Sequence, residues 1–191
     1  MGGEKLEQAA AGDVGRRLRE FRTERGLSLA EVAKATGIST SFLSLVETGQ
    51  SDITFGRLSR LINFYGLEFG DLALASRRNP VVLRAGEETH AVSLGEGIDV
   101  FFLACKPHAP ITPVIAIYEP GGETSEPIQV AGDEFVYVLE GTLELTIQGE
   151  RPIVLRAGDS AYVSSKSARA HTYRNAARRR TRALFAVSPK R

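Results

Sequence analysis

Residues 26–49, GLSLAEVAKATGISTSFLSLVETG, carry the signals for two short helices joined by a tight turn. Ser28 stands where an N-cap is expected, Glu31 completes a capping box, and Gly37 ends the first helix. Ser39 is the corresponding N-cap of the second helix. This arrangement predicts a helix-turn-helix, in which the second helix enters the major groove of DNA. Length and spacing fit a plain helical hairpin equally well.

The flanking sequence extends this pair of helices into a domain. Upstream, from Asp13 onward, apolar residues recur at the helical positions i, i+4 and i+7, namely Val14, Leu18 and Phe21. Two further short helices are expected near 54–65 and 68–75, and their inward-facing residues are Leu58, Leu61, Ile62, Phe64 and Leu72. The sequence therefore predicts a five-helix domain over residues 10–75.

A change of period marks the second half of the chain. Residues 76–80, SRRNP, are polar and basic and end in a proline, which indicates a linker. Residues 81–191 contain short β-rich runs separated by Gly, Pro, Asn and Asp: VVLRAG, DVFFLACK, PVIAIYEPGG, DEFVYVLEGTLELTIQGE, PIVLRAGDSAYVSS, RAHTYRN and TRALFAVSP. Together the halves predict an α+β protein of two domains, the second an all-β sandwich or barrel.

Composition limits the location of the protein. The chain has 191 residues and a formal net charge of +1, so its charge alone does not indicate a nucleic-acid partner. It has no apolar run near the roughly 18 residues of a membrane span and no apolar signal-peptide core at the N-terminus. Cys105 is the single cysteine, which agrees with a reducing compartment. We expect a cytoplasmic protein that does not act at a membrane.

Residues 14–72 resemble the helix-turn-helix domain of the XRE, or lambda-repressor-like, transcriptional regulators. The resemblance rests on LREFRTERGLSLAEVAKATGISTSFLSLVETGQ and LSRLINFYGLEFGDL. It implies double-stranded DNA as a partner and an ion pair between Arg22 of the first helix and Glu47, which closes the recognition helix. The chain departs from the family at Leu29, where a glutamine often stands, so Ser28 becomes the expected phosphate contact there.

The expected DNA contacts are short polar side chains around a recognition helix that begins at Thr40. Their hydroxyl groups can bind base edges or phosphates, and the helix N-terminus itself favours phosphate. No residue of this helix is an Arg, Asn or Gln, so direct base readout should be modest. The candidates are Ser28, Ser39, Thr40, Ser41, Ser44 and Gln50, with Arg57 as a further backbone contact. Gln50 and Arg57 are equally compatible with ordinary surface positions.

Residues 81–189 resemble a small cupin, a double-stranded β-helix barrel. The spacing of the first cupin motif falls on Gly122, Ile128, Val130, Glu134 and Gly141, and the second motif runs from Gly158 through His171 to Asn175. The family has histidines where this chain has Ile128 and Val130. Only Glu134 and His171 remain of the usual ligand positions, and a divalent metal needs three or four N/O ligands. His90 and His108 could in principle substitute as ligands, but nothing in their spacing places them inside the barrel. We therefore expect no metal cofactor.

With Ile128 and Val130 at the histidine positions, the first cupin motif leaves a mainly apolar interior with few polar groups. We expect it to be an effector pocket lined by Ile128, Val130, Glu134, His171 and Tyr173. Glu134 could pair there with a cationic group of the effector. The alternative is that Glu134 and His171 bond to each other inside a solidly packed barrel.

A helix-turn-helix domain followed by a cupin domain resembles a class of bacterial one-component regulators. The resemblance implies a homodimer that places two recognition helices in successive major grooves, about 34 Å apart. It implies a small-molecule effector in the cupin and no enzymatic activity, with coupling through the linker at 76–80. The alternatives are a metal-dependent cupin enzyme with a DNA-binding appendage and a cupin that only dimerises.

Overall fold

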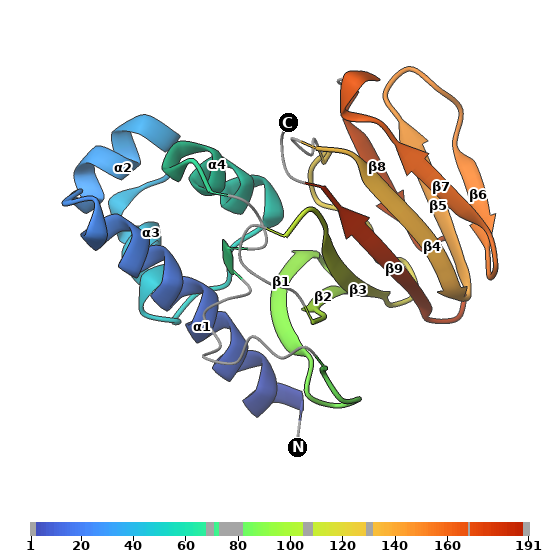
Figure 1. The fold of residues 1–191 in the computed structure, drawn as a ribbon, viewed down its shortest axis with the longest axis horizontal. Coiled ribbons are helices and arrows are strands. Elements are labelled where there is room, and N and C mark those ends of the chain that lie inside the picture. Colours follow the sequence, from blue (N-terminus) through green and yellow to red (C-terminus); the bar gives the residue numbers. More distant parts are fainter. Residues whose placement is uncertain are drawn as a thin grey trace.

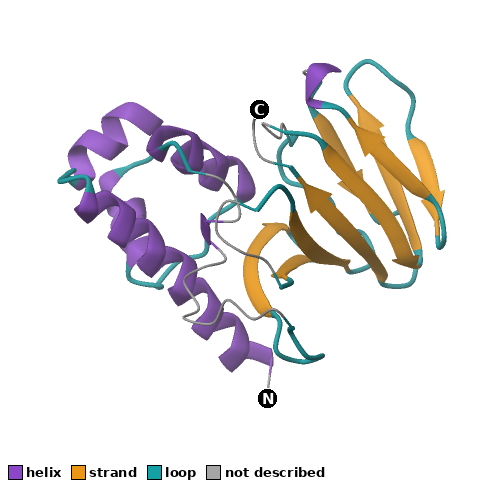
Figure 2. Ribbon diagram, viewed as in Figure 1, coloured by secondary structure: helices purple, strands orange, loops and turns teal. Residues whose placement is uncertain are grey.

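The computed structural model describes residues 3–67, 71–72, 82–104, 109–128, 132–167 and 169–188. Helices form the first half of the chain and strands the second (Figures 1 and 2). The helices are α1 (Gly3–Glu24), α2 (Leu29–Thr36), α3 (Thr40–Glu47) and α4 (Phe55–Tyr65). The remaining elements are β1 (Thr89–Gly95), β2 (Ile98–Phe102), β3 (Thr112–Tyr118), β4 (Glu134–Glu140), β5 (Thr142–Ile147), β6 (Ile153–Arg156), β7 (Ser160–Val163), the 3₁₀ turn η1 (Ser165–Ser167), β8 (His171–Arg174) and β9 (Thr181–Val187).

The central helix pair begins and ends where the sequence predicts. The Ser28 side chain accepts a hydrogen bond from the Glu31 backbone N–H at 3.2 Å, and the Glu31 carboxylate accepts one from the Ser28 N–H at 2.7 Å. Gly37 ends α2 in the left-handed conformation, with φ of 71°. Ser39 caps α3 by accepting a hydrogen bond from the Phe42 N–H at 3.3 Å. The capping box, the glycine stop and the second N-cap are confirmed.

The first helix is longer than expected. It starts at Gly3 instead of Asp13, because the preceding residues are rich in Glu, Lys, Leu, Gln and Ala, which favour helix. Val14, Leu18 and Phe21 are buried, as their spacing predicts.

Gly15 allows α1 to approach α3 closely. A Cβ atom at this position would lie 1.8 Å from the carbonyl oxygen of Val46 and 2.9 Å from its carbonyl carbon. Both obstacles belong to backbone, so they cannot rotate away as the end of a side chain could. Any larger residue would force the recognition helix off α1.

The end of the helical domain differs from expectation at Phe64. Phe64 does not face inward: it is 37% exposed, and Tyr65 takes the core position at 6%. Tyr65 follows Leu61 and Ile62 by four and three residues, so it continues their buried stripe, whereas Phe64 lies beside it. The fifth helix expected at 68–75 falls mostly outside the described residues, of which Asp71 and Leu72 are helical. The described part therefore contains four helices.

The β half forms two antiparallel sheets. One has six strands in the order β1-β2-β3-β9-β4-β7, and the other has three in the order β6-β5-β8. The α+β class with an all-β second domain is confirmed. The expected strand VVLRAG is wrong over residues 82–86, which form a bend and a turn. The first strand lies instead at Thr89–Gly95, a weakly alternating stretch.

Several predicted features lie outside the described residues. These are the linker 76–80, Cys105, His108 and Val130. Within the described part, none of the helices is long and apolar enough to cross a lipid bilayer.

Hydrogen bonds of a buried asparagine hold the end of the second motif in place. The side-chain amide of Asn175 donates to the carbonyl oxygens of Tyr118, Glu119 and Arg179 at 3.0, 3.2 and 2.8 Å. Its side-chain oxygen accepts from the Ala177 N–H at 3.0 Å. Asn175 thus ties the end of β3 to the turn that follows β8, and no ligand is needed to explain it.

Candidate nucleic-acid interface and cupin site

The recognition helix α3 divides into a buried and an exposed side. Leu43 and Val46 are each 2% exposed and face the core. Thr40, Ser41 and Ser44 are exposed on the other side. The side chains expected to contact DNA are therefore available at the surface.

Two of the predicted contacts already have structural roles. The Ser28 Oγ donates to the Glu31 carboxylate at 2.7 Å, and the Ser39 Oγ accepts from Phe42 and lies 3.3 Å from the Ser41 Oγ. The backbone and side-chain hydrogen bonds from Ser28 lower the pKa of Glu31, which keeps this carboxylate charged at neutral pH. A charged carboxylate so close to Ser28 would repel a phosphate, so Ser28 is a weaker candidate for a phosphate contact. Thr40 and Ser41 are the stronger candidates.

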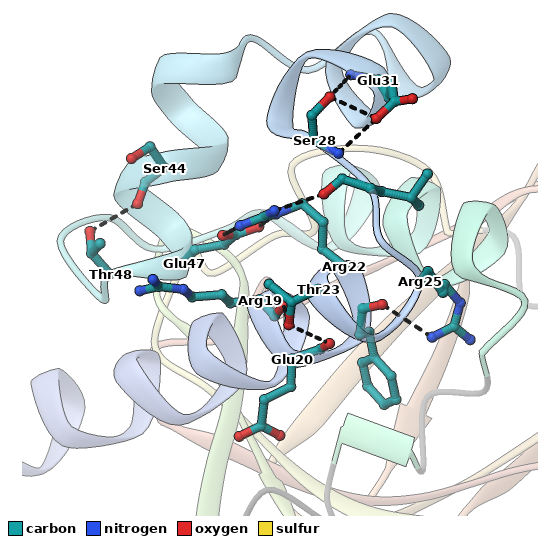
Figure 3. A network of polar contacts seen from close by, with 12 residues as sticks. Arg19, Glu20, Arg22, Thr23, Arg25, Ser28, Glu31, Ser44, Glu47 and Thr48 are labelled. Atoms are coloured by element: carbon teal, nitrogen blue, oxygen red, sulfur yellow. Dashed lines mark hydrogen bonds and ion pairs between the residues drawn. The ribbon is translucent and has the colours of Figure 1, made fainter.

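Arg22 and Glu47 fix the angle of α3 against the other helices (Figure 3). The Nε and Nη2 of Arg22 donate to the two carboxylate oxygens of Glu47 at 2.7 and 2.8 Å. Its Nη1 donates to the carbonyl oxygen of Leu27 at 2.8 Å. The side chains of Arg22 and Glu47 are only 13% and 6% exposed. One guanidinium thus joins α1, α3 and the turn before α2.

The two residues suggested as backbone contacts lie close to α3. Gln50 is exposed, and its backbone N–H donates to the Leu45 carbonyl oxygen at 2.8 Å. The guanidinium carbon of Arg57 lies 4.4 Å from the ring centroid of Phe42, a cation–π contact with a recognition-helix side chain. This contact holds a positive charge at the edge of the helix.

In the cupin barrel, three of the predicted pocket residues meet. The Glu134 Oε1 accepts a hydrogen bond from the Tyr173 hydroxyl at 2.6 Å and lies 3.1 Å from the His171 Nε2. Glu134, His171 and Tyr173 are 4%, 1% and 1% exposed. Ile128 is also buried, and its backbone exchanges two hydrogen bonds with that of His171, at 2.7 and 3.0 Å. Alternation along β8 accounts for the shared orientation of His171 and Tyr173.

Tyr118, at the end of β3, is a member of this cluster that the sequence reading missed. It is fully buried; burial raises its pKa well above the ordinary value, and the nearby Glu134 charge adds to the effect. The same two causes raise the pKa of Tyr173, with its hydrogen bond to Glu134 contributing. Both tyrosines are therefore neutral phenols at physiological pH. Tyr118 could have been found from its even spacing with Val114 and Ala116, which places it on the inner face.

Two polar atoms of the cluster are left without partners. The Tyr118 hydroxyl and the His171 Nδ1 are buried, and neither forms a hydrogen bond within the described part of the chain. With the His171 proton on Nε2, facing Glu134, the Nδ1 lone pair is an acceptor. The interior thus offers one unused hydroxyl and one unused imidazole nitrogen beside a carboxyl group.

These residues do not fit a divalent metal. The donor set comprises one carboxylate and one imidazole, and the imidazole nitrogen nearest the carboxylate is occupied by it. Ile128 has no donor atom in its side chain. Among the described residues, no group of three or more His, Cys, Asp or Glu side chains is placed to hold a metal ion.

Comparisons with known proteins agree with both halves. A family model described as a helix-turn-helix domain matches residues 13–75, and one described as a cupin domain matches residues 114–187. The HTH-type transcriptional regulator PuuR of Escherichia coli is 28% identical over 139 residues, which cover 71% of this chain and 75% of that protein. The chain is a helix-turn-helix transcriptional regulator with a cupin domain.

A second sequence relative and one solved structure match different lengths of this chain. The HTH-type transcriptional regulator DdrOP3 of Deinococcus deserti is 43% identical over 56 residues, covering 29% of this chain and 43% of that protein. A helix-turn-helix family transcriptional regulator from Vibrio cholerae superposes with a TM-score of 0.68 at 18% identity, covering 96% of this chain and 99% of that one. The second likeness shows that the two-domain fold recurs along the whole chain.

The stability of the regulator should respond differently to loss of the hydroxyl group at its two buried tyrosines. Tyr173→Phe removes a donor to Glu134 and should lower the free energy of unfolding by about 1–3 kcal/mol. Tyr118→Phe removes a buried hydroxyl that has no partner among the described residues, and should leave the free energy of unfolding unchanged or raise it. Chemical denaturation of both variants measures the difference. Equal destabilisation by the two substitutions would contradict the hydrogen bonding described for the cluster.

Proposed function

We propose that this regulator is a cytoplasmic homodimer that binds a specific double-stranded DNA site through α3. A small molecule bound inside the cupin barrel changes that affinity. The chain has no enzymatic role, since the described residues of the barrel lack the ligand set that cupin metal chemistry requires.

The DNA part of the proposal is supported by the exposed start of α3. Thr40 and Ser41 project from a helix that Arg22 and Glu47 hold in place, and the α3 N-terminus favours a phosphate. Two copies related by a two-fold axis would contact half-sites about 34 Å apart, in a palindromic site.

The effector part rests on one observation: the Tyr118 hydroxyl and the His171 Nδ1 are buried without hydrogen-bond partners among the residues that the structure describes. Leaving a buried polar group unsatisfied costs about 1–3 kcal/mol, so packing alone would not favour this arrangement. A ligand with a hydrogen-bond acceptor for Tyr118 and a donor for His171 would satisfy both atoms. The adjacent carboxyl group of Glu134 favours a neutral or cationic ligand over an anionic one. The bond between Glu134 and His171 fits a packed barrel as well, but a packed barrel leaves these two atoms unexplained.

A short segment of the cupin joins the barrel to the DNA-binding domain. At one end, Ile128 is bonded to His171 through the backbone. Two residues earlier, the Glu126 carboxylate lies against the first turn of α4, where a Cβ atom on Gly56 would be 1.9 Å from its Oε2. A ligand that shifts His171 would move this segment, and with it the contact on α4. This route adds to the linker at 76–80 as a means of coupling.

The DNA-binding proposal is tested by replacing the exposed hydroxyls of α3. A duplex selected from a random pool by the wild-type chain should bind the Thr40→Ala, Ser41→Ala double variant at least about tenfold more weakly, with unchanged thermal unfolding. Fluorescence anisotropy at fixed salt measures both affinities, because phosphate contacts make binding steeply salt-dependent. Thr23→Ala, which truncates an exposed hydroxyl on α1, is the control and should bind normally. Undiminished affinity of the double variant would show that α3 does not read the site.

The effector proposal is tested with a screen of small polar metabolites by thermal shift, paired with native mass spectrometry of the purified chain. A true effector should raise the melting temperature and change the affinity for the selected duplex. Tyr118→Phe should lose most of that shift, whereas Ile153→Ala, on the outside of β6, should keep it. If no compound stabilises the chain and none copurifies, the cupin domain has a purely structural role.

A further inference from the structure

One face of the larger sheet is apolar on the outside as well as the inside. Along β4, burial alternates: Glu134, Val136 and Val138 point into the barrel, and Phe135, Tyr137 and Leu139 point outward. These three outward side chains are 37%, 37% and 38% exposed, and Tyr162 on the neighbouring β7 is 63% exposed. The strand register puts Phe135 opposite Tyr162 and Tyr137 opposite Leu184 of β9. We call this surface of β2, β3, β9, β4 and β7 the outer face.

Exposing an apolar surface of this kind to water is unfavourable in free energy. A soluble monomer seldom exposes a contiguous apolar patch of more than about 300–600 Å², and larger patches mark interaction sites. Figure 1 shows the helices next to β1, at the end of the six-stranded sheet opposite β4 and β7. The helical domain therefore does not account for the apolar character of the outer face.

We infer that the outer face binds the same face of a second copy of this chain, forming the homodimer on which the proposed function rests. At about 4.8 Å between strands and about 3.4 Å per residue, β2, β3, β9, β4 and β7 present roughly 500 Å² in projection. A standard stable interface buries roughly 800 Å² per partner, of which this sheet face would supply the larger part. Flat, two-sided contact between sheets is a common way to bury such a surface.

Charges at one end of the outer face are suited to a two-fold partner. A hollow of about 250 Å³ lies there, with Phe101, Ile115 and Ile117 among its lining residues, and its charged residues are Glu88, Glu140, Arg180 and Arg182. These are two acidic and two basic side chains, and none forms an ion pair with another described residue. A two-fold interface is self-complementary, so an arginine of one copy can meet a glutamate of the other. A patch of one sign would repel its own copy.

The proposal is tested by sedimentation velocity of the full chain, whose monomer mass is 20.7 kDa. The wild type should sediment at twice that mass. Tyr137→Lys and, separately, Phe135→Lys should weaken the dimer at least about 100-fold, because a lysine at the centre of the interface must be desolvated. Both positions are partly exposed in the monomer, so circular dichroism should show unchanged folding. If one variant fails to fold, the other still provides the test.

The matched control is the pair Ile153→Lys and Val154→Lys. Both residues are exposed apolar side chains on β6, at 43% and 52%, and belong to the other sheet. These variants should stay dimeric. If Tyr137→Lys and Phe135→Lys remain as dimeric as the wild type, the outer face is not the interface, although the homodimer of the proposed function stands. A wild type that remains monomeric even with the selected duplex would overturn both.

Discussion

The contact between α1 and α3 determines how the recognition helix is presented. Gly15 lets the two backbones approach at the Val46 carbonyl. Further along α1, the Arg22 guanidinium donates two hydrogen bonds to the Glu47 carboxylate. The first contact sets the distance between the helices, and the second sets their angle. Because the ion pair is nearly buried, its value lies more in fixing one geometry than in net stability. Every exposed hydroxyl of α3 takes its direction from this arrangement.

In the cupin half, the residues that build the barrel are different from those that could bind a ligand. The Asn175 amide donates to the carbonyl oxygens of Tyr118 and Glu119 at the end of β3 and to that of Arg179 in the turn after β8. Gly141 makes the turn after β4 with φ of 80°. Both residues serve the backbone of the barrel. The metal positions carry no such demand, and Ile128 stands at one of them. Around the motif's ligand positions lies a hydrogen-bonded cluster centred on Glu134, in which two polar atoms have no partner among the described residues.

Local signals predicted the helical domain well and the β domain less completely. Ser28, Glu31, Gly37 and Ser39 act through bonds within a few residues, so their roles can be seen in the sequence. The same holds for the alternation that buries His171 with Tyr173. The close approach at Gly15 was missed because it depends on a residue far along the chain. Tyr118 was missed for the same reason, since only the assembled barrel brings it near Glu134.

Errors arose where a local pattern was ambiguous. VVLRAG has the composition of a strand, yet residues 82–86 form a turn, and the weaker stretch at Thr89–Gly95 pairs with β2. Phe64 is apolar but lies one position away from the buried stripe that ends at Tyr65. The outer face could not be recognised from alternation alone, because Phe135, Tyr137 and Leu139 are as apolar as the inward residues between them. Burial in the folded chain is what distinguishes the two sets.

Hydroxyl-radical footprinting of the wild-type chain on its selected duplex tests the central claim most directly. A two-fold regulator that reads DNA with α3 should protect two patches related by a dyad, with centres one helical turn, about 10 base pairs, apart. A single protected patch, or no protection at protein concentrations that should saturate the duplex, would contradict the account.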